Sequence, residues 1–104
     1  MKKTSPSNVQ QEREFQKDVL SYLENEVGGY WLKICASSFQ KQGEPDIIGC
    51  YRGKFYAFEL KKDKSSRASE LQKYKLKKIK ENGGVSMKVF SLNQLKELFE
   101  NGGE

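Results

Sequence analysis

Apolar residues near the start of the chain recur every three or four positions, which is the spacing of an amphipathic helix. Ser7, followed three residues later by Gln10, has the pattern of an N-terminal capping box. The spacing predicts a helix over about residues 8–25 that ends before Gly28-Gly29. The apolar positions on its buried arc are Phe15, Val19, Tyr22 and Leu23.

Three short runs of aromatic and β-branched residues follow, and turn residues bound each of them. The runs over residues 30–35, 46–51 and 54–61 predict strands. Arg52-Gly53 separates the second run from the third, which is a β-hairpin signal. The polar stretch over residues 37–44 is typical of a loop.

The last third of the chain returns to helical spacing, passes through one strand and ends in a helix. A helix is predicted over about residues 68–81, with the glycines of Asn82-Gly83-Gly84 suited to a left-handed C-cap. Residues 85–90 form a last predicted strand, and Ser91 with Gln94 caps a final helix. The order α-β-β-β-α-β-α predicts an α/β fold, in which helices pack on the faces of a mixed sheet.

The length, composition and charge of the chain limit which kinds of protein it can be. A chain of 104 residues has room for one compact domain, and we expect residues 1–6 and 101–104 to fray at its ends. The net charge of +5 favours a polyanionic partner. The chain has no histidine, and its two cysteines lack metal-ligand spacing, which excludes a zinc site and histidine-based catalysis. No apolar run reaches the length of a membrane span, so we expect a cytoplasmic protein without a membrane partner.

Glu12 projects onto the same arc as the apolar residues of the first predicted helix, whereas Glu14 points to the opposite side. A carboxylate on a core-facing stripe is costly unless a cation or hydrogen bonds compensate it. Alternatively, Glu12 lies one turn before the apolar stripe and is solvated near the helix start, where the helix dipole favours an acid. The helical position alone leaves both interpretations open.

Asp46 and Glu59 lie on the two strands of the predicted hairpin, each near the end away from the turn, so pairing brings them together. Strand alternation places Lys61 on the same face as Glu59. Clustered carboxylate oxygens suit Mg²⁺, and the lysine can orient a water or stabilise charge during phosphodiester hydrolysis. The structural alternatives are a turn role for Asp46 and a buried ion pair between Glu59 and Lys61.

The residues Pro45-Asp46, an interval of twelve residues and then Glu59-Leu60-Lys61 resemble the signature of the PD-(D/E)XK nuclease superfamily. The segment over residues 43–49 resembles the G-x-P-D form seen in virus-type replication-repair nuclease (VRR-NUC) domains and archaeal Holliday-junction resolvases. Residues 12–16 and 69–72 resemble two further helical motifs of those proteins. The resemblance covers about residues 9–90 and implies a restriction-endonuclease-like α-β-β-β-α-β core, to which this chain adds a C-terminal helix.

The resemblance also implies roles for individual residues. Asp46, Glu59 and the backbone carbonyl of Leu60 are expected to ligate the metal, Lys61 to act on the water nucleophile, and Glu12 to complete the acidic cluster. Gln72 is assigned to the same site. Ser69 and Gln72 also fit a capping box at a helix start, so both interpretations of Gln72 stay open.

Basic residues outside the predicted site are candidates for holding the DNA backbone without reading its sequence. Lys73, Lys77 and Lys80 fall on the side of their helix away from its apolar arc and are expected to form an ordinary solvated face. The predicted DNA contacts are Lys33, Lys41, Arg52, Lys62, Lys64, Arg67 and Ser69.

The sequence therefore predicts that residues 1–104 form a single nuclease domain. We expect a Mg²⁺-dependent DNA endonuclease, with Mn²⁺ able to substitute, that selects branched DNA such as a Holliday junction. Resemblance to junction resolvases implies a homodimer, and the small size suits a phage or mobile-element enzyme. The alternatives are a catalytically inactive DNA-binding module on the same fold, a sequence-specific restriction-type nuclease, and a basic interaction protein whose acids are structural.

Overall fold

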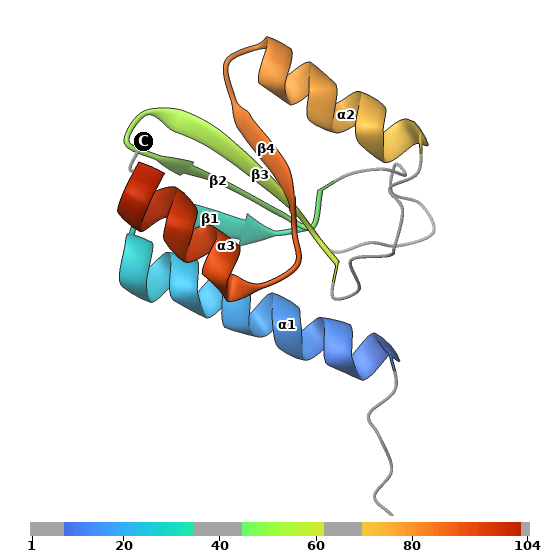
Figure 1. Cartoon of the computed structure of the whole chain (residues 1–104), viewed down its shortest axis with the longest axis vertical. Helices are drawn as coiled ribbons and strands as arrows, with labels where there is room; N and C mark the ends of the chain where they lie inside the picture. The colour runs from blue at the N-terminus through green and yellow to red at the C-terminus, as the bar shows by residue number, and fades with distance from the viewer. Residues whose placement is uncertain (1–7, 35–44, 62–69, 103–104) are drawn as a thin grey trace, which may run out of the picture.

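The computed structural model describes residues 8–34, 45–61 and 70–102, with side chains described between residues 13 and 100 of these ranges. These residues form three α-helices and four strands, and a π-helical turn follows the first helix and the last (Figure 1). The elements are α1 (Asn8–Tyr22), η1 (Leu23–Val27), β1 (Tyr30–Lys33), β2 (Ile47–Tyr51), β3 (Lys54–Leu60), α2 (Glu70–Glu81), β4 (Val85–Val89), α3 (Leu92–Lys96) and η2 (Glu97–Gly102).

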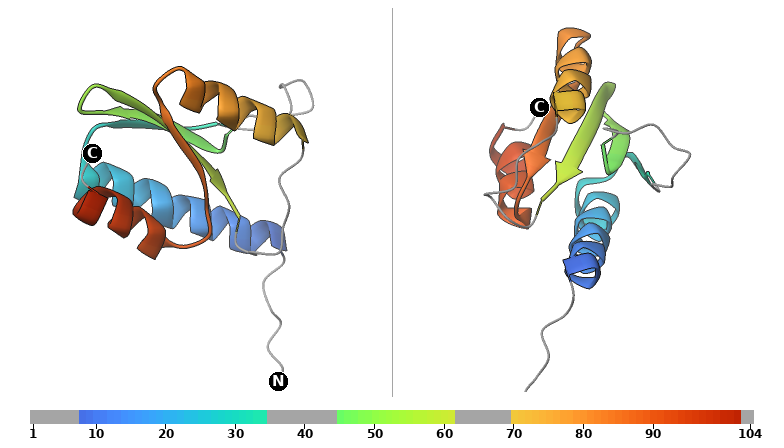
Figure 2. Two further views of the ribbon diagram at one scale, coloured as in Figure 1. Left: turned by 45° about the horizontal axis from the view of Figure 1, so that its top comes forward. Right: turned by 90° about the vertical axis from the view of Figure 1, so that its right-hand side faces the viewer.

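The strands form one mixed sheet in the order β1-β2-β3-β4. β1, β2 and β3 pair antiparallel, whereas β4 lies parallel to β3 and is reached through the crossover helix α2. Helices α1 and α3 lie on one side of the sheet and α2 lies on the other (Figures 1 and 2). The predicted α/β fold, with helices on the faces of a mixed sheet, is confirmed.

Element boundaries differ from the predicted ones by a few residues, as is usual where hydrogen bonding fades. β2 begins at Ile47 rather than Asp46, and β3 ends at Leu60 rather than Lys61. Backbone pairing nevertheless continues one residue further, because the Lys61 amide donates to the Val89 carbonyl at 2.9 Å. At the start of α3, the amide of Ser91 donates to Gln94 Oε1 at 3.2 Å, which is the glutamine half of the predicted capping box. Ser7 lies outside the described residues.

The main core lies between the sheet and the helices α1 and α3. The predicted apolar arc of α1 is buried there and packs against large side chains of β1, β2 and β3. The Trp31 ring stacks on Phe58 at 5.9 Å between centroids, and the Trp31 indole nitrogen donates to the Gly28 carbonyl at 2.7 Å. The indole thus connects the residue after η1 to the aromatic face of the sheet on which α1 packs, and α1 carries part of the candidate site described below.

α2 covers β3 and β4 on the opposite side of the sheet. Ser86 of β4 is buried, and its hydroxyl donates to the Leu76 carbonyl of α2 at 2.7 Å. β3 is therefore an inner strand that is covered on both faces, and every residue from Tyr56 to Leu60 is buried. None of the helices in the described part of the chain is long and apolar enough to cross a membrane.

Gly49 leaves the space that Trp31 occupies across the β1–β2 pair. The two residues are register partners, and the indole lies over the glycine. A Cβ at position 49 would lie 2.1 Å from Trp31 Cε3 and 2.5 Å from the Tyr30 carbonyl oxygen. A backbone atom cannot yield as the end of a flexible side chain can, so any larger residue must force the two strands apart.

We expect Gly49→Ala to lower the free energy of unfolding by about 3 kcal/mol, because the added methyl overpacks the Trp31 contact. Urea unfolding followed by tryptophan fluorescence measures this loss. Cys50→Ala is the matched control, since Cys50 is the exposed neighbour on the same strand. A Gly49→Ala protein as stable as the control would show that the indole has room for a methyl group.

Candidate active site

Asp46 and Glu59 meet at the open end of the β2–β3 hairpin. Asp46 precedes β2, and its amide donates to the Phe58 carbonyl of β3 at 2.9 Å. Its carboxylate then accepts a hydrogen bond from the Leu60 amide, with 2.8 Å between Oδ2 and the nitrogen. Pairing of the two strands therefore holds the Asp46 side chain at Leu60, next to Glu59 and Lys61.

Glu59 is buried, with only 3% of its surface exposed, although it carries an ionisable group. Its Oε2 accepts a hydrogen bond from Gln72 Nε2 at 2.6 Å and lies 3.6 Å from Lys61 Nζ. Among the described residues, no group donates to its other oxygen, Oε1, which is also buried. A buried carboxylate oxygen without a donor is unfavourable in a protein unless a cation or water meets it.

Burial is the main reason why the pKa of Glu59 is raised to about 7, and the nearby Asp46 carboxylate raises it further. Lys61 and the hydrogen bond from Gln72 act in the opposite direction without cancelling the rise. Two neighbouring carboxylates repel each other when both are charged, and a bound cation removes that repulsion, so the pair is suited to bind one.

A small cavity of about 80 Å³ opens where these residues meet α1. Asp46, Glu59, Leu60 and Lys61 line it from the sheet, and Phe15 and Gln16 line it from the helix. The cavity joins two carboxylates and one lysine from a hairpin to one polar side chain from a helix. The two carboxylates and the lysine were predicted from the sequence.

The donor set of this cavity fits Mg²⁺. Within the described ranges, no group of three or more Asp, Glu, Cys or His side chains forms a complete metal cage. Mg²⁺ does not need one, because it commonly binds through one or two carboxylates and keeps several waters. Asp46, Glu59 and the Leu60 carbonyl are the candidate ligands, and the partnerless Glu59 Oε1 is the observation that favours a cation there.

Of the two predicted site residues on helices, Gln72 contacts Glu59, whereas Glu12 is placed by its backbone alone. Glu12 belongs to α1 and precedes the cavity-lining residues Phe15 and Gln16 by one helical turn, but its side chain lies outside the described part of the chain. Gln72 lies in the first turn of α2, and its amide nitrogen contacts Glu59. The alternative capping box requires Ser69, which is outside the described residues.

Gln16 also lines the cavity, although the sequence motifs did not predict it as a site residue. It is half-buried in α1 and lies four residues after Glu12, so it belongs to the same stripe of the helix. That spacing was the available signal, but glutamine in a helix is too common to be singled out by spacing alone.

The predicted DNA contacts do not all lie near the cavity. Lys33 is exposed at the end of β1, next to Ile34, whose amide donates to the Asp46 carbonyl at 2.8 Å. Arg52 is at the hairpin turn, the end of β2 and β3 remote from the carboxylates, with its guanidinium carbon 5.2 Å from the centre of the Tyr51 ring. Lys41, Lys62, Lys64, Arg67 and Ser69 lie outside the described residues.

Comparisons with known proteins agree with this architecture. The sequence matches the family described as archaeal Holliday junction resolvase (Hjc) over residues 7–97. Among solved structures, the fold is similar to that of a "VRR_NUC domain protein", with a TM-score of 0.70 and 22% sequence identity over 86% of this chain and 84% of that one. A comparison with curated proteins found no match. The first two findings confirm the resemblance that the motifs predicted.

The raised pKa of Glu59 makes the stability of the metal-free protein depend on pH. An unfolded glutamate titrates near 4.5 and the folded one near 7, so the folded state binds more protons between these values and loses stability as the pH rises. We expect Glu59→Gln to match the parent near pH 4 and to exceed its free energy of unfolding by about 3 kcal/mol near pH 8. Urea unfolding in EDTA across this range tests the difference.

Glu24→Gln is the matched control, because Glu24 is an exposed glutamate of η1. It removes the same charge without removing a buried carboxylate. A parent and a Glu59→Gln protein whose stabilities run parallel from pH 4 to pH 8 would show that Glu59 ionises without a penalty.

Proposed function

Because the chain belongs to the archaeal Holliday junction resolvase family, we propose that it is a Mg²⁺-dependent endonuclease that hydrolyses phosphodiester bonds in branched DNA. One observation carries the metal-dependent chemistry: the buried, partnerless oxygen of Glu59 beside Asp46 in a cavity that Lys61 also lines. If Glu59 formed only a structural ion pair with Lys61, we would expect a hydrogen-bond donor at its second oxygen as well.

Three groups of this chain are proposed to hold the metal: the carboxylates of Asp46 and Glu59 and the backbone carbonyl of Leu60. When bound, Mg²⁺ supplies a positive charge that stabilises the phosphate and lowers the pKa of water. Glu12 is proposed to complete the acidic cluster. The hydrogen bond from the Leu60 amide keeps Asp46 oriented, and the hydrogen bond from Gln72 does the same for Glu59.

Lys61 is proposed to act on the water that attacks phosphorus. Its ammonium lies 3.6 Å from Glu59 Oε2 and remains partly exposed, so it can also contact a phosphate that enters the cavity. A lysine donates three hydrogen bonds as a compact charge, which suits it to orient a water and to stabilise negative charge on the reacting oxygens.

A homodimer is the proposed working form. A four-way junction is resolved by cutting two strands, and one carboxylate cavity of this kind is built from α1 and the β2–β3 hairpin of a single chain. Two copies related by a two-fold axis place two equivalent sites on the two-fold symmetric substrate. Selection of branched DNA then rests on the spacing between the paired sites rather than on base contacts.

We expect the purified protein to cut a four-way junction in Mg²⁺ or Mn²⁺, to cut a linear duplex of the same sequence more slowly, and to cut neither in EDTA. Asp46→Ala and Glu59→Ala each remove a proposed ligand, so each should lower the cleavage rate by at least about 100-fold. A gel assay on labelled junctions measures the rates, and Glu24→Ala is the control. A parent that binds the junction but never cuts it with either metal would exclude the nuclease.

Lys61→Met should lower kcat by about 100-fold while leaving Mg²⁺ affinity unchanged or tighter, because it removes the proposed partner of the water but not a metal ligand. Calorimetric titration with Mg²⁺ measures the affinity alongside the cleavage rate. Lys54→Met, at the exposed start of the same strand, is the matched control. Cleavage by Lys61→Met at the parental rate would remove this lysine from the mechanism.

A further inference from the structure

A second hollow lies beside the carboxylate cavity, between helix α1 and strand β1. It has a volume of about 370 Å³, and we call it the α1–β1 hollow. Its lining residues are Arg13, Glu14, Gln16, Lys17, Leu20 and Lys33. Arg13 and Lys17 were not among the predicted DNA contacts. Arg13 and Lys17 are four residues apart and therefore lie on one stripe of α1, next to Gln16.

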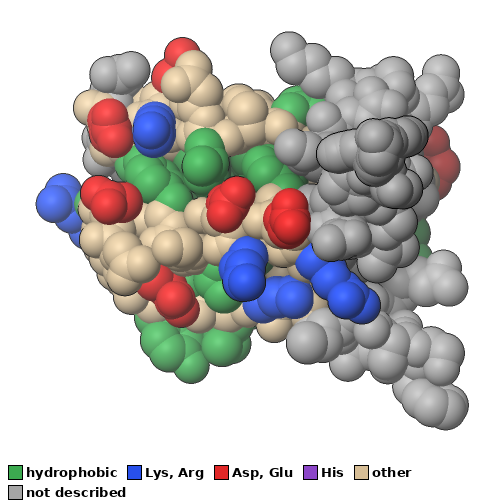
Figure 3. Space-filling model, turned by 90° about the horizontal axis from the view of Figure 1, so that it is seen from below, with side chains coloured by type: hydrophobic (Ala, Val, Ile, Leu, Met, Phe, Trp, Pro, Cys, Tyr) green, Lys and Arg blue, Asp and Glu red, His purple; other side chains and the backbone are tan. Residues whose placement is uncertain are grey.

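The α1–β1 hollow is positively charged, with three cations against the single carboxylate of Glu14. Figure 3 shows a group of Lys and Arg side chains near the middle of the face that α1 forms. No ion pair with an Asp or Glu is recorded for these three cations among the described residues, whereas Lys73 and Lys77 of α2 lie 3.4 Å and 3.8 Å from glutamates of their own helix. The cations of the hollow are therefore placed to meet an outside anion.

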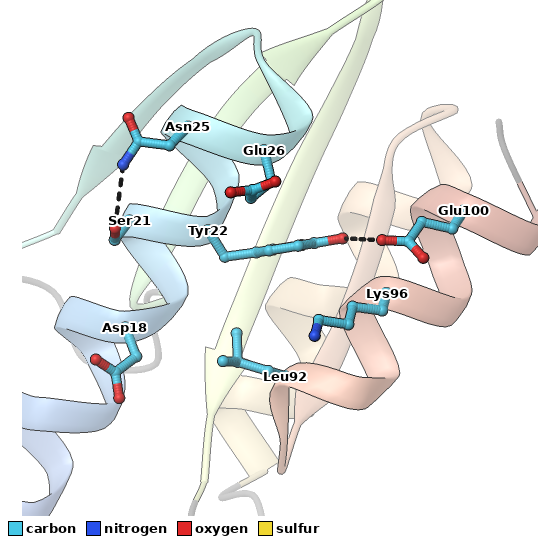
Figure 4. Close-up of a pocket in the computed structure, with 8 residues that line it drawn as sticks. All are labelled: Asp18, Ser21, Tyr22, Asn25, Glu26, Leu92, Lys96 and Glu100. Carbon is cyan, nitrogen blue, oxygen red and sulfur yellow. Dashed lines mark hydrogen bonds between the residues drawn. The ribbon is translucent and has the colours of Figure 1, made fainter.

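The other side of α1 has the opposite charge. A cavity of about 520 Å³ between α1 and the last helical segment is lined by Asp18, Glu26 and Glu100, with Lys96 as its cation (Figure 4). Tyr22 crosses this cavity, and its hydroxyl donates to Glu100 Oε2 at 3.3 Å. A polyanion that approaches α1 is thus repelled on one side of the helix and attracted on the other.

Two contacts connect the α1–β1 hollow with the carboxylate cavity. Gln16 lines both spaces, so they adjoin at this side chain. Lys33 directly precedes Ile34, whose amide donates to the Asp46 carbonyl at 2.8 Å, so the end of β1 is held against the metal-binding residue. An anion in the hollow is therefore a near neighbour of any phosphate at Asp46 and Glu59.

We infer that the α1–β1 hollow binds a second backbone phosphate of the strand that is cut, which fixes the direction in which that strand crosses α1. This inference rests on the proposed nuclease function and adds a phosphate subsite to it. Because the hollow and the carboxylate cavity adjoin at Gln16, we place the second phosphate within about two nucleotides of the cleaved bond.

The shape and lining of the hollow suit a nucleotide backbone rather than a small inorganic ion. Leu20 and the alkyl stems of Arg13 and Lys17 supply apolar surface below their charged ends. A deoxyribose can pack on that surface while its phosphate meets the guanidinium and the ammonium groups. The volume of about 370 Å³ accommodates both groups.

Affinity for a four-way junction, measured in EDTA so that no cleavage occurs, tests the subsite. We expect Lys17→Gln or Lys33→Gln alone to raise Kd about threefold, and the double variant to raise it about tenfold. Because the cations share one phosphate and Arg13 remains, the double variant should reduce the magnitude of the slope of log K against log salt by at most about 0.9 in total, not by that amount per lysine.

Lys80→Gln/Lys96→Gln is the matched control, since it removes the same charge from exposed positions on α2 and α3. We expect its Kd to stay within about twofold of the parental value. If the control and the hollow double variant weaken binding equally, the effect is one of net charge and the inference is wrong.

Junctions that carry one uncharged methylphosphonate at successive positions identify the phosphate itself. The parent should lose about tenfold in affinity at one position within about two nucleotides of the cleaved bond. Lys17→Gln/Lys33→Gln should show a clearly smaller loss than the parent at that position and the parental loss at all others, since only Arg13 still contacts the phosphate. Equal losses for both proteins at every position would overturn the inference.

The outcomes separate this inference from the proposed function. If the parent neither binds nor cuts the junction, both are wrong. If the parent cuts in Mg²⁺ and the hollow variant matches the control in affinity, in salt slope and in the methylphosphonate scan, the nuclease assignment stands and the phosphate subsite does not. Melting temperatures within a few degrees of the parent's exclude misfolding as a cause of lost affinity.

Discussion

The buried carboxylate of Glu59 is the constraint on which the rest of the site depends. Water cannot solvate it, so its charge has to be compensated by groups that the fold brings to it: the Gln72 amide at 2.6 Å and the Lys61 ammonium at 3.6 Å. Their compensation is incomplete, because one oxygen has no donor among the described residues and the pKa stays raised. A site that is poorly stabilised by its own protein is well prepared for a divalent cation.

The architecture of the sheet explains how such a carboxylate is held in place. β3 is an inner strand, covered by α1 and α3 on one face and by α2 on the other, so its last residues are buried whichever way they point. The hairpin places Asp46 beside Leu60, and the parallel partner β4 fixes the Lys61 backbone through Val89. The ends of β2, β3 and β4 thus meet at one end of the sheet, and the aromatic core around Trp31 supports these strands.

Charged side chains are arranged so that a basic hollow lies on one side of α1 and an acidic cavity on the other. Arg13, Lys17 and Lys33 surround the α1–β1 hollow, and Asp18, Glu26 and Glu100 surround the cavity on the side of α3. The net charge of the chain shows only that it is basic. Its arrangement about one helix, next to the cavity proposed to bind the metal, is what would offer a DNA strand one favourable path under the proposed function. The same helix packs on the core through its apolar arc and carries, on its neighbouring face, the cations proposed to contact the substrate.

The sequence by itself determined the order of the elements, the family, and the approach of Asp46 to Glu59 and Lys61, because a two-residue turn and strand alternation are local rules. It left Gln72 between a helix cap and the site, overlooked Gln16, and grouped Arg52 with the other candidate DNA contacts although it lies at the remote end of the hairpin. Only the tertiary structure decided these positions. Each depends on how a helix packs against a strand distant in sequence, and that packing is set by the whole core rather than by any local pattern.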